Sequence, residues 1–251
     1  MASVETATIT GRSRRVRRLA ALVTLVSLGV AAILAGGIGL RHELSRGATK
    51  AEAAAALAAE IGSRWERLPA GTIFPATVSY QDVAGNTATA TLVGIKPPAA
   101  CQAALEPAAA AQIRRLRCTT MLRATYVSAG GALAATIGIA VLRSPAAAGQ
   151  AERSLLPVSP GSALHTVPYP GTITAGFTDL ARGAAGVQVA GPYLFLYTAG
   201  YTDTEPGSAV AAGLGAGGSG ELQSLGVAIL GAAENALTSH GNPCSMRDIS
   251  C

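Results

Sequence analysis

The stretch that decides the fold reads TTMLRATYVS over residues 119–128, AGG over 129–131 and ALAATIGIAVL over 132–142. Both longer runs are rich in β-branched and large apolar residues, which is typical of strands in a sheet. The two glycines between them suit a tight turn. Residues 119–142 are therefore predicted to form a β-hairpin.

Similar patterns continue on both sides of this hairpin. Gly85-Asn86 is a turn signal between two strand-like runs, and four prolines in 157–170 predict a loop. Further strands are predicted at 72–80, 87–95, 172–178, 186–190 and 192–201, and helices at 48–68, 99–117, 145–156 and 208–237. Because hairpins use the connections that a parallel sheet would need, we expect an α+β fold with an antiparallel sheet and helices packed on one face.

A long apolar segment precedes this region. Leu19–Leu40 contains 22 residues without a charge. A helix of that length reaches about 33 Å, which is enough to cross the roughly 30 Å hydrocarbon core of a bilayer. Five arginines precede the segment, so the positive-inside rule predicts a cytoplasmic N-terminus and an extracytoplasmic C-terminal domain at the cell membrane.

Other interpretations of the apolar segment are a cleaved secretory signal and a lipoprotein anchor. Ala35-Gly36-Gly37 is an acceptable cleavage site, although the apolar stretch is longer than that of an ordinary signal peptide, and whether the anchor is cleaved stays open. Ser13-Arg14-Arg15 resembles the start of a twin-arginine signal, but the rest of that pattern is missing. No cysteine lies at the end of the stretch, which excludes a lipoprotein anchor.

Composition and charge exclude several classes of protein. The chain has 251 residues, of which 49% are apolar and 13% charged, so it is too apolar for a disordered protein. Its net charge of +5 is concentrated in residues 1–18, which carry +4, while the remainder carries only +1. The folded part therefore shows no basic surface for nucleic acid.

The four cysteines all follow the apolar segment. An even number of cysteines in an exported domain indicates disulfides. Three connectivities are possible. The one that closes the shortest loops pairs Cys101 with Cys118 and Cys244 with Cys251. The spacing of the cysteines and of the three histidines does not match a zinc site, and we expect no metal.

Together these features predict five segments. They are a cytoplasmic basic tail at 1–18, a transmembrane helix at 19–40, a stalk helix at 41–68, an extracytoplasmic α+β domain at 69–204, and a C-terminal helical, Gly-rich segment at 205–251 that ends in a disulfide loop.

Part of the domain resembles a known family. The motifs are WERLPAGTIFP at 65–75, a cysteine pair at the next helix and strand, LRATY at 122–126 and AGPY at 190–193. They resemble a family of single-pass actinobacterial membrane proteins with an exported domain, over about residues 65–199. The resemblance implies this topology and no particular activity, and Cys244 and Cys251 lie outside it.

The search for catalytic chemistry is mostly negative. GLGAGG at 213–218 matches a dinucleotide-binding pattern, but no strand precedes it, so it is interpreted as a flexible segment and no cofactor is expected. Ser162 and His165 are the best candidates for a nucleophile and its base, although no acid is evident beside them. Two further groups are interpreted as ordinary surface: a basic cluster of Arg114, Arg115 and Arg117, and the acids Asp179, Asp203 and Glu205, which lack calcium-loop spacing.

Two classes of function remain. The first is a non-enzymatic binding or interaction module of the cell envelope, whose partners are the lipid bilayer through Leu19–Leu40 and another envelope protein. The alternative is an exported hydrolase with an unrecognised site. The missing catalytic constellation favours the first class, with no catalytic, cofactor or metal residue assigned.

Overall fold

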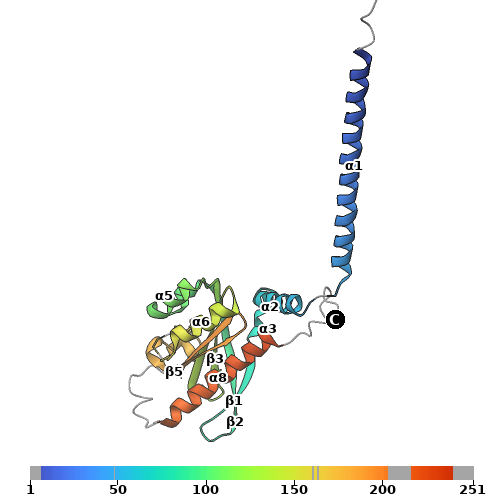
Figure 1. Cartoon of the computed structure of the whole chain (residues 1–251). Coiled ribbons are helices and arrows are strands. Elements are labelled where there is room, and N and C mark those ends of the chain that lie inside the picture. The colour runs from blue at the N-terminus through green and yellow to red at the C-terminus, as the bar shows by residue number, and fades with distance from the viewer. Residues whose placement is uncertain (1–6, 48, 160, 163, 203–215, 240–251) are drawn as a thin grey trace, which may run out of the picture. The chain divides into compact units, whose positions relative to one another are not determined.

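The computed structural model describes residues 7–47, 49–159, 161–162, 164–202 and 216–239, and it divides into two units. The first unit contains the N-terminal helix α1 (Ala7–Ser45), which is uninterrupted (Figure 1). Within α1, Ala20–His42 is long and apolar enough to cross a membrane, and none of it is buried in the protein. This matches the predicted span and suits either a membrane anchor or a signal sequence.

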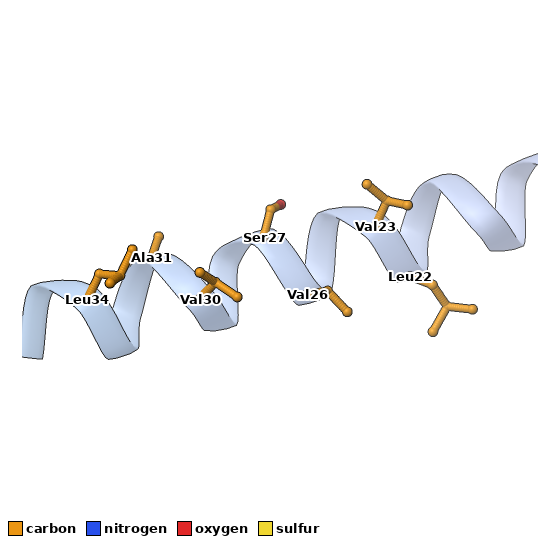
Figure 2. A pocket seen from close by; sticks show the side chains of 7 residues that line it. All are labelled: Leu22, Val23, Val26, Ser27, Val30, Ala31 and Leu34. Atoms are coloured by element: carbon orange, nitrogen blue, oxygen red, sulfur yellow. The ribbon is translucent and has the colours of Figure 1, made fainter.

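The surface of α1 is mainly apolar over the part that could span a membrane, Ala20–His42. Figure 2 shows Leu22, Val26 and Leu34 projecting away from the helix, as side chains that contact lipid do. The two hydroxyl groups in this stretch are satisfied within the helix: Thr24 Oγ1 donates to Ala20 O (2.5 Å) and Ser27 Oγ donates to Thr24 O (3.0 Å). The span therefore brings no unpaired side-chain hydroxyl into an apolar medium.

The second unit holds a six-stranded antiparallel sheet and its helices (Figure 1). The strands are β1 (Thr77–Gln81), β2 (Thr87–Ala99), β3 (Thr120–Ser128), β4 (Leu133–Val141), β5 (Arg182–Ala190) and β6 (Tyr193–Tyr201), in the order β1-β2-β3-β4-β6-β5. The helices are α2 (Lys50–Arg67), α3 (Ala70–Ile73), α4 (Cys101–Ala104), α5 (Pro107–Arg115), α6 (Pro145–Leu155) and α8 (Ala216–Thr238), with two 3₁₀ turns, η1 (Ile173–Gly176) and η2 (Asp179–Ala181). The predicted hairpins and the antiparallel α+β class are confirmed.

The core has two layers, one on each face of the sheet. On one face, alternate residues of β4 and β6 such as Ile137 and Phe195 pack against α8. On the other face, residues between them such as Ala140 and Leu196 pack with α4, α5 and α6. Helices therefore cover both faces rather than the one that was expected. β4 is buried throughout, which explains why its sequence is almost continuously apolar.

Two segments differ from their sequence-based predictions. The predicted stalk is split, because α1 ends at Ser45 and α2 begins at Lys50, and the last turns of α2 pack Ile61 and Trp65 against the core. The predicted strand at 172–178 is the 3₁₀ turn η1, where Thr172 Oγ1 caps the backbone N–H of Thr174 (3.2 Å). Such a side-chain bond offers the backbone a local alternative to a strand.

The C-terminal helix α8 belongs to the folded unit. One row of its apolar side chains, which includes Leu222, Leu225 and Leu237, is buried in the core. The buried guanidinium of Arg64 on α2 donates to the carbonyl oxygens of Leu237 (3.1 Å) and Ser239 (2.6 Å), which satisfies the end of α8. Cys244 and Cys251, with their predicted disulfide loop, lie outside the described residues.

Candidate functional site

The segment between α6 and β5 lies on the sheet face that also carries α6. Val167 is fixed there by two threonines of the sheet, since its N–H donates to Thr136 Oγ1 (3.0 Å) and its carbonyl accepts from Thr125 Oγ1 (2.8 Å). A Cβ atom at Gly138 would lie 2.7 Å from Leu164 Cδ1, and one at Gly200 would lie 1.9 Å from a backbone oxygen of the segment. Glycine in the strands therefore lets this covering segment (residues 157–181) approach closely.

Four charged or ionisable residues meet where the covering segment starts and ends. Glu106 immediately precedes α5, His165 lies in the segment, Asp179 opens η2 and Arg182 opens β5. His165 Nδ1 lies 2.8 Å from Asp179 Oδ2 and 3.5 Å from Glu106 Oε1. Arg182 Nη1 lies 2.8 Å from Glu106 Oε1 and 3.6 Å from Asp179 Oδ1.

Backbone groups complete this cluster. Asp179 Oδ1 accepts from the backbone N–H of Thr166 (2.8 Å) and from its hydroxyl (3.0 Å). Arg182 donates to the carbonyl oxygens of Asp179 (2.8 Å) and Leu164 (3.2 Å). Burial alone would raise the pKa of Asp179, but the bonds from Thr166 and His165 and the charge of Arg182 hold that pKa below its usual value. The cluster therefore binds the covering segment to α5 and to β5.

The cluster contains donor atoms that suit a metal ion. Glu106 Oε1, His165 Nδ1 and Asp179 Oδ2 lie within 4.8 Å of one another, and these atom types bind Zn²⁺. However, Arg182 is in ion-pair contact with both carboxylates and already supplies the positive charge that a metal would bring. These residues would hold a cation only if the Arg182 guanidinium moved away.

The structure supports one part of the predicted hydrolase site and contradicts another. His165 has an acid partner that sequence analysis missed, because Asp179 binds Nδ1 and leaves Nε2 as the possible base. Ser162, however, closes a local turn: its Oγ donates to Ser159 O and accepts from Ser159 N, both at 2.9 Å. Among the described residues, Ser162 makes no hydrogen bond to His165. The predicted nucleophile and base are therefore not coupled.

The remaining sequence candidates form no site in the described structure. Arg114, Arg115 and Arg117 are exposed around the end of α5 and make no ion pair with any described residue. Asp203, Glu205 and the glycines at 213 and 215 lie outside the described residues.

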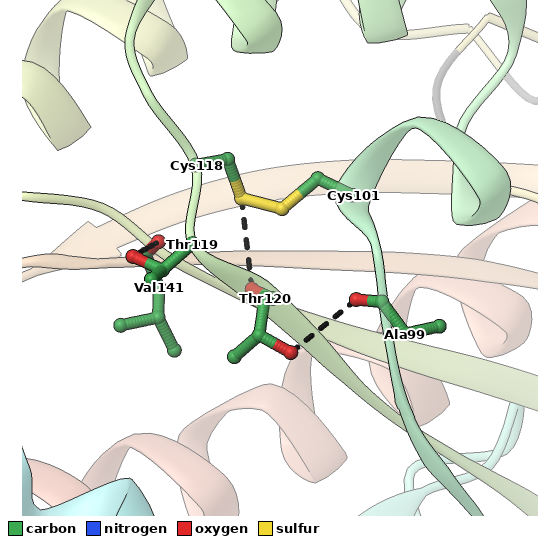
Figure 3. The surroundings of a disulfide bond; sticks show 6 residues. All are labelled: Ala99, Cys101, Cys118, Thr119, Thr120 and Val141. Carbon is green, nitrogen blue, oxygen red and sulfur yellow. Dashed lines mark hydrogen bonds between the residues drawn. A yellow bond between two sulfur atoms is a disulfide. The ribbon is translucent and has the colours of Figure 1, made fainter.

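The first predicted cysteine pair does form a disulfide. Cys101 at the start of α4 is bonded to Cys118 just before β3, with their Cα atoms 6.2 Å apart (Figure 3). Hydrogen bonds flank it on both sides: Thr119 N donates to Val141 O (2.8 Å) and Thr120 Oγ1 donates to Ala99 O (3.3 Å). The bond thus fixes α4 against the ends of three central strands.

The residues that form the charged cluster are far apart in the sequence. Glu106 is 59 positions from His165 and Arg182 is 17 positions beyond it, so no local spacing or periodicity relates them. Comparison with known proteins adds no relative, because no family model, no curated protein and no solved structure matches the chain.

Proposed function

We propose that the chain is a membrane-anchored extracytoplasmic protein whose folded domain acts as a non-enzymatic interaction module of the cell envelope. The observation that carries this proposal is the Cys101–Cys118 disulfide in a chain with one apolar helix of membrane-spanning length. Structural disulfides persist in oxidising compartments, which supports a location of the domain outside the cytoplasm. The five arginines before the span support the same orientation.

The site geometry supports binding rather than catalysis. The charged cluster consists of Glu106, His165, Asp179 and Arg182. Its polar groups are paired with one another and with the backbone, and these bonds hold the covering segment in place. A hydrolase would need a nucleophile within hydrogen-bond reach of His165, and Ser162 is engaged elsewhere. The domain then presents a disulfide-stabilised surface to other envelope components.

A pair of reporter fusions tests the topology. Alkaline phosphatase, which is active only after export, is fused after Cys251 of the full chain. As the matched control, a fluorescent protein that matures in the cytosol is fused to the N-terminus of the full chain in a second strain. We expect both reporters to be active. Phosphatase activity that is absent while the fusion is stably expressed would contradict the proposed orientation.

A second experiment addresses the interaction role. Crosslinking in intact cells, followed by purification of the full chain in detergent, should return one envelope protein reproducibly. The Cys101→Ser/Cys118→Ser chain, which keeps the anchor, is the control and should return less of it. Recovery that depends only on the anchor would contradict an interaction through the domain.

The exported hydrolase remains a second candidate because of the 2.8 Å contact between His165 and Asp179. A serine-directed fluorophosphonate probe distinguishes the two candidates. We expect no labelling of the purified full chain. Labelling that disappears in both Ser162→Ala and His165→Ala, while the Ser159→Ala control keeps it, would establish the hydrolase instead.

A further inference from the structure

Two cations lie side by side on the neighbouring strands β2 and β3. Lys96 on β2 and Arg123 on β3 are directly paired in the antiparallel register. The covering segment places the ring of Tyr169 beside them, with Lys96 Nζ 5.6 Å from the ring centroid. A Cβ atom at Gly94 would lie 2.4 Å from Tyr169 Cε1, so glycine at this position is what allows the ring to lie against β2. Lys96, Arg123 and Tyr169 are called the cationic triad below.

Two buried polar atoms of the cationic triad are not satisfied by the described residues. They are Arg123 Nε and Tyr169 Oη, for which the described part of the chain offers no hydrogen-bond partner. Within the described part of the chain, neither Lys96 nor Arg123 forms an ion pair. Arg64 and Arg182, in contrast, are each paired with a carboxylate. Buried donors are nearly always satisfied, so an unpartnered Nε of Arg123 next to an unpartnered hydroxyl of Tyr169 indicates a missing acceptor.

The electrostatics agree with this view. Burial lowers the pKa of Arg123, although the neighbouring Tyr169 opposes the shift, and burial also raises the pKa of Tyr169. Arginine nevertheless keeps its proton, and Lys96 is exposed and charged. Two positive charges therefore lie together without a compensating anion from the described residues, and a group that brings negative charge would be stabilised there.

We propose that the cationic triad binds a phosphate group. A phosphate monoester carries about −1.5 to −2 charges at neutral pH and three acceptor oxygens. It can therefore accept from Arg123, Lys96 and Tyr169 together and offset both positive charges. A carboxylate offers one charge and two oxygens, and leaves one cation unpaired. The phosphate monoester has two sources that the test must separate, a soluble phosphate ester and the headgroup of a lipid such as phosphatidic acid.

Binding by the purified full chain in detergent tests this site, and the result does not depend on the topology of the chain. We expect titration with inorganic phosphate to be saturable at one site per chain and to raise the melting temperature. Arg123→Gln and Lys96→Gln should each weaken binding about tenfold or more, because each removes a charge-assisted hydrogen bond. Tyr169→Phe should weaken it less. Arg115→Gln, which removes an exposed charge outside the triad, is the matched control and should bind as the wild type does.

Further ligands separate the sources of the phosphate. Glycerol 3-phosphate represents a soluble monoester, nanodiscs that contain phosphatidic acid represent a monoester on a lipid surface, and acetate represents a carboxylate. Arg123-dependent binding of either phosphate ligand supports the proposal and identifies the source. Equal affinity for acetate, an equal loss in Arg115→Gln, or no saturable binding of any phosphate ligand would overturn it. Should Arg123→Gln fail to fold, the exposed Lys96→Gln variant decides.

Discussion

Thr136 and Thr198 lie directly opposite each other on β4 and β6, yet only one of their buried hydroxyl groups has a partner. Thr136 Oγ1 accepts from Val167 N (3.0 Å) and lies 2.9 Å from Thr125 Oγ1. Because the Thr125 proton is donated to Val167 O, the Thr136 proton must be donated to Thr125. Thr198 Oγ1 is buried and makes no hydrogen bond to any described residue. The hydroxyl group of Thr136 therefore stabilises the fold, whereas the buried hydroxyl group of Thr198 lowers its stability.

The first prediction concerns Thr136. Thr136→Val keeps the shape of the side chain but leaves the buried N–H of Val167 without an acceptor. An unsatisfied buried donor costs about 1–3 kcal/mol. We expect the free energy of unfolding of the full chain in detergent to fall by about this amount, as measured by denaturant titration.

Thr198→Val is the matched control. It removes a buried hydroxyl that has no partner, so we expect it to leave the stability unchanged or to raise it slightly. Equal destabilisation by the two substitutions would show that the threonine network does not hold the covering segment.

The second prediction compares two glycines in the interior of α8. A Cβ atom at Gly226 would lie 2.2 Å from the ring of Tyr197, whereas one at Gly231 would meet nothing within 4 Å. Gly231→Ala should therefore stabilise the protein by roughly 0.5–1 kcal/mol, because alanine is the better helix former. Gly226→Ala should destabilise it by about 1–3 kcal/mol through overpacking against β6. Melting temperatures that shift in the same direction would contradict the described packing of α8.

Much of the fold could be predicted from the sequence because its signals are local. The glycine turn at 129–131 and the apolar runs beside it specify the central hairpin, and the uncharged stretch after Arg18 specifies the long helix. The wrong prediction of a strand at 172–178 also has a physical cause. Its threonines suggest a strand, but Thr172 caps its own turn and Gly171 adopts a positive φ of 78°, which ends extended structure.

The charged cluster and the cationic triad could not be predicted in the same way. Their members come from distant segments, and only the folded sheet brings Lys96 beside Arg123 or Glu106 beside His165. One local signal did exist. Arg123 is the only charged residue in β3. A charged side chain in a mostly buried strand needs an ion-pair or hydrogen-bond partner.

The third prediction concerns the disulfide. The bond between Cys101 and Cys118 closes a loop with a sequence separation of 17. In the chain-entropy model a loop of this size contributes about 3 kcal/mol. The Cys101→Ser/Cys118→Ser chain should lose about this much stability in denaturant titration. Proteolysis without reductant should return one crosslinked fragment that contains both cysteines, and a fragment that links Cys101 to Cys244 or Cys251 would contradict the pairing.

The last prediction concerns acid. The pKa of Asp179 is below its usual value in the folded protein, so its ionised form stabilises the fold above the unfolded pKa of about 3.9, and this contribution is lost as the pH falls through the folded pKa. Asp179→Asn should therefore lower the melting temperature at pH 7 and flatten its fall between about pH 5 and pH 3. Asp82 also has a lowered pKa, so part of the acid dependence should remain. Glu66→Gln, at an exposed position on α2, is the control and should keep the wild-type profile. A profile for Asp179→Asn that runs parallel to that of the wild type would show that the charge of the carboxylate does not hold the covering segment. The ion pair with Arg182 needs this charge, and the bonds from Thr166 and His165 are strengthened by it.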